Sequence, residues 1–198
     1  MLTGLGQLEF RILDWFVDLT HSDVLDVIVP KISFLGDGGW FWILLAVLFL
    51  TWKPTRKMGL TAALALLLSL LVANVILKPM VGRIRPFELK PAIQLLIDKP
   101  LDPSFPSGHT QASFAAATVI YRNKKWPGIA ALSLATLIGL SRMYLYVHYA
   151  SDVFAGAAIG YGLGCLADMV VNEIRYRHNA KKRRRPKRTM QQKRPKRS

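Results

Sequence analysis

The chain has 198 residues, 52% of them hydrophobic, and a formal net charge of +15. That charge would suit a nucleic-acid-binding protein, but 13 of the 27 Lys and Arg residues lie between Arg175 and Ser198. The other 14 are nearly balanced by the 12 acidic residues, so the body of the chain is close to neutral. A single cysteine, Cys165, excludes an internal disulfide and a metal site built from several thiolates.

The N-terminal segment has the pattern of amphipathic helices. Leu8, Ile12, Trp15 and Leu19 recur at helical spacing, with charged residues between them. We expect helices over residues 5–20 and 22–34 that lie in the membrane interface or pack on a helix bundle. The alternative is that this segment crosses the membrane once.

Uncharged runs in the rest of the chain predict membrane spans. They cover residues 38–52, 58–77, 103–121, 126–141 and 153–167. A spanning helix needs about 20 mainly apolar residues. The run over residues 58–77 has that length, and the other four runs reach it only with polar flanking residues. We therefore predict an all-α, polytopic transmembrane helix bundle of five spans, or six if the N-terminal segment also crosses, with N-terminal amphipathic helices.

Basic segments predict the orientation and the domains. Residues 53–57, 122–125 and the C-terminal tail follow the first, third and fifth spans, so all three share one side, which the positive-inside rule makes the cytoplasm. We expect a multi-pass plasma-membrane protein. Its three parts would be N-terminal interfacial helices (1–36), a transmembrane core (37–174) and a disordered basic cytoplasmic tail (175–198).

Two further features bear on partners. The tail should attract anionic lipid headgroups, and residues 179–198 contain no aromatic residue on which bases could stack, so no specific nucleic acid is expected. Gly156, Gly160 and Gly164 are spaced by four. This spacing allows close helix packing within the chain or in a homodimer.

Three polar clusters fall on the side opposite the basic segments. They lie at residues 78–86, 106–109 and 141–152. Lys78, Arg85 and Arg142 are cations near membrane depth, and Asp152 alone cannot neutralise three charges. A bound phosphate could, because Arg offers a planar fork of donors and Lys a point charge. The clusters therefore indicate a phosphate site on the extracytoplasmic face.

The same clusters contain the groups for phosphoryl transfer. Ser107 adds a hydroxyl, Gly108 lets the backbone approach an anion, and a helix beginning there would point free N–H groups at it. His148 and Asp152 are four residues apart, so the carboxylate could orient the ring for nucleophilic attack. His109 could then protonate the leaving oxygen. The set predicts a phosphohistidine intermediate without a metal ion or other cofactor.

These motifs resemble a known family. Lys-x6-Arg-Pro, Pro-Ser-Gly-His and Ser-Arg-x5-His-x3-Asp match the three signatures of the type 2 phosphatidic acid phosphatase superfamily. That family includes bacterial undecaprenyl-diphosphate and phosphatidylglycerophosphate phosphatases, glucose-6-phosphatase and vanadium haloperoxidases. The resemblance covers roughly residues 22–172.

The resemblance implies residue roles and a substrate class. The catalytic residues would be His148, His109 and Asp152, and the phosphate ligands Lys78, Arg85, Ser107, Gly108 and Arg142. The expected function is hydrolysis of a lipid phosphate, with undecaprenyl diphosphate of cell-wall synthesis as the first substrate and phosphatidylglycerophosphate or phosphatidic acid as alternatives. A non-enzymatic membrane adaptor that uses the polybasic tail is the alternative from another class.

Overall fold

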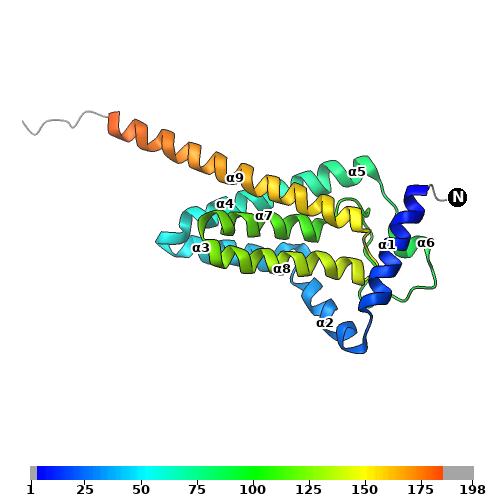
Figure 1. The fold of residues 1–198 in the computed structure, drawn as a ribbon. Coiled ribbons are helices and arrows are strands. Elements are labelled where there is room, and N and C mark those ends of the chain that lie inside the picture. Colours follow the sequence, from blue (N-terminus) through cyan, green and yellow to red (C-terminus); the bar gives the residue numbers. More distant parts are fainter. Residues whose placement is uncertain (1–3, 185–198) are drawn as a thin grey trace, which may run out of the picture.

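The computed structural model describes residues 4–184, which form helices and no strand (Figure 1), so the all-α prediction is confirmed. The helices α1 (Gly4–Thr20) and α2 (Asp23–Phe34) match the two predicted N-terminal helices. The other α-helices are α3 (Trp40–Thr51), α4 (Arg56–Leu70), α5 (Lys78–Val81), α6 (Pro86–Leu89), α7 (Gly108–Asn123), α8 (Lys125–Tyr144) and α9 (Ala150–Arg184). Three short segments complete the order: 3-10 turns η1 (Asp37–Gly39) and η2 (Lys53–Thr55), and a π-helical stretch η3 (Leu71–Leu77).

The helices α3, α4, α7, α8 and α9 run side by side as a bundle, while α1 and α2 lie at one end of it (Figure 1). Helix α7 is central and packs against α4, α8 and α9. An ideal Cβ on Gly160 would lie 2.3 Å from Gln111 O, and Gly156 and Gly164 approach α7 similarly. The glycine spacing of α9 therefore serves packing within the chain, the first of the two predicted uses.

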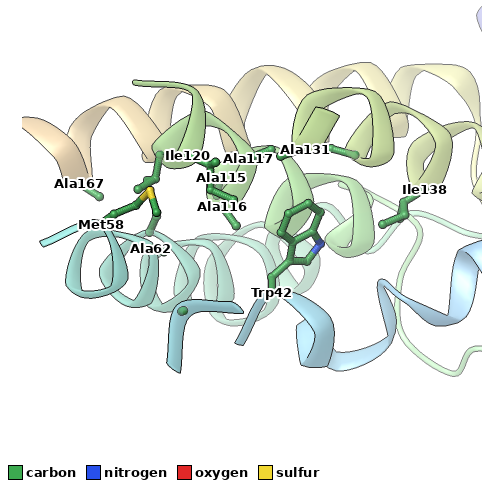
Figure 2. Packing of buried hydrophobic residues seen from close by; sticks show 14 residues of the cluster. Trp42, Met58, Ala62, Ala115, Ala116, Ala117, Ile120, Ala131, Ile138 and Ala167 are labelled. Atoms are coloured by element: carbon green, nitrogen blue, oxygen red, sulfur yellow. The ribbon is translucent and has the colours of Figure 1, made fainter. Parts of the chain in front are cut away.

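The core of the bundle is built from small side chains around a few large ones. Trp42 of α3 is 1% exposed and donates from Nε1 to Ser113 Oγ at 2.9 Å. Figure 2 shows it in the cluster with Met58, Ala62 and the alanines of α7. Small residues let the helices approach closely, which is how membrane bundles gain van der Waals contact.

The described helices do not establish the predicted number of membrane spans. Within the described residues, Arg56–Leu89 and Ala150–Lys182 are long and apolar enough to cross a membrane, and α2 with residues 37–51 would make a third span bent by 43°. The predicted five or six spans are therefore not confirmed. Helix α7 falls short because it has only 16 residues, about 24 Å, and its sequence is rich in Ala, Ser and Thr. It faces other helices rather than lipid, so it needs little hydropathy of its own.

The two ends of the bundle have different chemistry. At one end, Lys57 and Arg122 both lie near the buried carboxylate of Asp168, at 3.6 and 2.9 Å. The three motifs lie at the other end, near α5 and α1. Helix α9 extends past its neighbours to Arg184 (Figure 1). The predicted disorder from residue 175 is thus wrong for residues 175–184, and the rest of the tail lies outside the described residues.

Candidate active site

The three motifs meet at one cavity of about 1040 Å³. Six of the eight predicted site residues line it: Lys78, Arg85, Gly108, His109, Arg142 and His148. The other two, Ser107 and Asp152, are fully buried. Ser107 N donates to Asp152 O at 3.1 Å, so the second and third motifs are hydrogen-bonded to each other. Sequence positions up to 74 residues apart are thereby brought into one site.

Helix α7 begins at the cavity, as predicted. Ser107 has extended backbone angles and is the N-cap, with its Oγ 3.5 Å from Thr110 N and 2.9 Å from Thr110 Oγ1. An ideal Cβ on Gly108 would lie 3.5 Å from Lys78 Nζ. The first turn therefore presents free N–H groups beside a Lys, an arrangement that favours an anion.

His148 lies in the turn between α8 and α9, not within a helix. Its Nδ1 is 3.5 Å from Asp152 Oδ2, while its Nε2 is 3.2 Å from Arg85 Nη1. Burial is the largest effect on the pKa of His148 and lowers it. The hydrogen bond to Asp152 raises the pKa, whereas the charges of Arg85 and Arg142 lower it, and the resulting pKa is about 3. The ring is therefore neutral. Because Arg85 can only donate, His148 Nε2 carries the lone pair and faces the cavity cations.

Asp102, which the sequence did not single out, neutralises two of the predicted phosphate ligands. Its carboxylate pairs with Lys78 Nζ and accepts from Arg85 Nη2 at 2.9 Å. Burial alone would raise the pKa of Asp102, but the hydrogen bond and charge of Lys78, together with the charge of Arg85, outweigh it and lower the pKa to about 2. A carboxylate thus occupies the place expected for phosphate oxygens.

Arg142 is held differently from the other two cations. It is 3% exposed, and one terminal nitrogen donates to Ser33 Oγ of α2. No acceptor within residues 4–184 lies within hydrogen-bonding distance of its Nε. A buried guanidinium N–H without an acceptor is costly, so this donor is available to a ligand in the cavity.

His109 at the start of α7 has a partner that the sequence did not reveal. Its Nε2 lies 2.6 Å from Asp37 Oδ1, in the turn between α2 and α3. Because Asp37 takes Nε2, the ring's other nitrogen, Nδ1, remains for the leaving group. Both histidines therefore have a carboxylate partner.

The structure also places Arg83, which the sequence did not single out as a site residue, beside Asp152. It donates to Asp152 Oδ1, pairs with Glu9 of α1, and its guanidinium lies 4.1 Å from the Tyr149 ring centre. Ser104, also not predicted, donates to Asp152 Oδ2 at 2.5 Å. Asp152 is therefore fixed from several sides, and α1 contributes to that support. Only the order Arg-x-Arg-Pro could have hinted at a role for Arg83.

The side chains of the site also bear on metal binding. Within the described residues, no group of three His, Cys, Asp or Glu side chains is placed to hold a metal ion. The cavity is instead lined by three cations and two imidazoles, which belong to Lys78, Arg85, Arg142, His109 and His148. That arrangement can bind an anion, supply a nucleophile and move a proton.

Comparison with known proteins agrees with this chemistry. Residues 58–175 match the PAP2 superfamily. An undecaprenyl-diphosphatase of Sulfolobus acidocaldarius is 36% identical over 120 residues, which cover 60% of this chain and 58% of that protein, less than two thirds of its length. A decaprenylphosphoryl-5-phosphoribose phosphatase of Mycobacterium tuberculosis is 35% identical over 139 residues, covering 70% and 76%.

A solved structure has the same fold. The crystal structure of Aquifex aeolicus LpxE superposes with a TM-score of 0.72 at 29% identity, covering 81% of this chain and 94% of that one. The family match spans more than half of the chain and contains all three motifs. The chain therefore belongs to the PAP2 superfamily.

Proposed function

We propose that this protein hydrolyses a lipid-linked phosphate or diphosphate through a phosphohistidine on His148. One observation carries the proposal: the cavity that holds the cations and both histidines continues along an apolar wall between α3 and α4. That wall includes Ile43, Val47, Leu66, Leu67 and Leu70. A substrate with a charged head and a long apolar tail fits both parts at once.

The first half of the reaction forms the phosphoenzyme. Lys78, Arg85, Arg142 and the N–H groups at the start of α7 hold the phosphate oxygens. The lone pair of His148 Nε2 forms a P–N bond, and the P–O bond to the leaving group breaks. The leaving oxygen keeps that electron pair and takes a proton from His109 Nδ1. Asp152 stabilises the positive charge that develops on His148.

The second half releases phosphate and restores the enzyme. His109, now neutral, accepts a proton from a water molecule as its oxygen attacks phosphorus. The P–N bond breaks and its electron pair returns to His148 Nε2. Inorganic phosphate leaves, and both histidines regain their starting states. The proposal requires no metal ion at any step.

Undecaprenyl diphosphate is the proposed substrate. Two relatives are named for polyprenyl phosphates, and the apolar wall runs along α3 from Ile43 to Leu50, about 10 Å of helix. Phosphatidylglycerophosphate and phosphatidic acid are the alternatives. The positive-inside rule supports an extracytoplasmic site, because residues 53–57 and 122–125 and the C-terminal part of α9 lie at the opposite end of the bundle.

Phosphate release by purified protein tests the substrate. We expect the highest kcat/KM with undecaprenyl diphosphate among the three lipids, and none with His148→Ala. Faster turnover of phosphatidylglycerophosphate would overturn the substrate choice. Lack of activity on all three lipids and on p-nitrophenyl phosphate would overturn the proposed function.

A groove variant tests whether the apolar wall holds the tail. Ala63 is exposed on α4 and lines the wall, so Ala63→Phe should lower kcat/KM for the lipid while leaving hydrolysis of tail-free p-nitrophenyl phosphate unchanged. Ala130→Phe, on an exposed position of α8 outside the cavity, is the matched control. An equal effect of both variants would contradict tail binding at this wall.

A further inference from the structure

The turn between α2 and α3 is shaped around the ring of His109. Gly38 and Gly39 have φ of 57° and 70°, a left-handed conformation that side chains other than glycine rarely adopt. An ideal Cβ on Gly36 would lie 2.7 Å from His109 Cδ2. This glycine-rich turn therefore lets its backbone contact the imidazole edge while Asp37 reaches Nε2 at 2.6 Å.

The charges around His109 make the carboxylate of Asp37 important for the protonation of the ring. Burial of the His109 ring disfavours its protonated form most strongly, the hydrogen bond and charge of Asp37 from η1 favour it, and the charges of Arg142 from α8 and Lys78 from α5 disfavour it further. A general acid must carry its proton when the leaving oxygen departs. Without an anion beside it, an imidazolium that lies near two cations would lose that proton readily.

The two histidine–carboxylate pairs differ in a way that suits two roles. The side chain of Asp152, beside His148, is fully buried, whereas 53% of the Asp37 side chain is exposed. The buried pair holds a neutral ring with a free lone pair, which a nucleophile needs. The exposed pair can exchange protons with water, which a group that is an acid in one step and a base in the next needs.

We propose that Asp37 is a positioning residue for the general acid: it binds His109 Nε2, directs Nδ1 toward the leaving oxygen and favours the protonated ring in the first half-reaction. This inference rests on the proposed acid role of His109. Asp37 would act through His109 and not on the phosphate. Its contribution should therefore depend on how much proton transfer the leaving group requires.

Two soluble substrates of similar size separate that effect from general damage. Phenyl phosphate has a much more basic leaving group than p-nitrophenyl phosphate, and kcat/KM for each reports the steps up to phosphoryl transfer. For Asp37→Asn we expect kcat/KM to fall about 10- to 100-fold with phenyl phosphate and less than about threefold with p-nitrophenyl phosphate. The pH above which kcat/KM declines should also move downward.

Controls keep the inference separate from the proposed mechanism. Asp23→Asn, an exposed carboxylate in the first turn of α2, should behave like the wild type with both substrates. The double variant Asp37→Asn/His109→Ala should be no slower than His109→Ala alone, because both act on one proton transfer.

The outcomes are distinguishable. If His109→Ala shows the same loss with both substrates, the general-acid role itself is wrong. If His109→Ala is selective for phenyl phosphate but Asp37→Asn slows both substrates equally, or neither, the positioning role of Asp37 is overturned.

Discussion

Replacing Asp102 by Asn should make the protein bind phosphate analogues more tightly. In the free protein its carboxylate pairs with Lys78 and Arg85, so an incoming phosphate must replace it on both cations. Asp102 is 49% exposed, and one pair with an exposed carboxylate contributes at most about 1 kcal/mol. Two such pairs give at most about 2 kcal/mol, which corresponds to at most about 30-fold in affinity.

The backbone of this loop should stay in place in the variant, because Arg85 Nε also donates to Asp102 O at 2.7 Å. The assay is the inhibition constant of vanadate, a mimic of the phosphoryl-transfer transition state, against p-nitrophenyl phosphate hydrolysis. We expect a lower inhibition constant for Asp102→Asn. Since the pKa of Asp102 is about 2, the carboxylate is ionised throughout an ordinary assay range and the effect should not vary with pH there. A higher constant would refute competition and show that Asp102 organises the cations for substrate.

The remaining predictions concern the histidines, metal ions and sidedness. His148→Ala should abolish turnover more completely than His109→Ala, because a diphosphate leaving group needs less proton assistance, whereas the nucleophile has no substitute; near-normal activity of both would remove the catalytic assignment. Activity should persist in excess EDTA and be inhibited by vanadate, and loss on chelation with recovery in Mg²⁺ or Zn²⁺ would count against the mechanism. In a Cys165→Ser background, a cysteine at Glu88 should react with an impermeant thiol reagent in intact cells, and one at Asn123 only after the membrane is opened. The reverse labelling would place the site in the cytoplasm.

The residues that meet at the site could be predicted from the sequence because each of the three motifs has a characteristic residue spacing. Ser107 caps α7 where the Pro-Ser-Gly-His motif indicated, and α1 and α2 lie where apolar periodicity placed them. Helical periodicity and capping are local properties of the chain, so a single sequence reveals them. The spacing of four residues likewise predicted the contact between His148 and Asp152, which the structure shows although His148 lies in a turn.

The carboxylates that complete the site could not be predicted in this way. Asp37 reaches His109 across 72 residues, and Glu9 reaches Arg83 across 74. Neither acidic residue lies in a recognisable motif, so only the packing of α1 and of the α2–α3 turn on the bundle brings them there. Asp102 likewise lies outside the motifs, although it pairs with two of the three cations for which the sequence indicated only Asp152.

Composition misled the prediction for the end of α9. A run rich in Lys and Arg indicates disorder by charge, but both residues are good helix formers. A helix that already exists extends more easily than a new one begins. Helix α9 therefore continues through residues 175–184 as an extension of a candidate membrane-spanning helix.

The most direct test of the account is to trap the phosphoenzyme. In His109→Ala, p-nitrophenyl phosphate should still phosphorylate the protein because its leaving group departs without an acid, whereas hydrolysis of the intermediate should stall without a base. Rapid quenching at alkaline pH, which preserves phosphohistidine, followed by mass spectrometry should then find phosphate on His148. Additional loss of His148 should abolish the signal. Phosphate on another side chain such as Ser107, or steady turnover without any phosphoenzyme, would contradict the proposed mechanism.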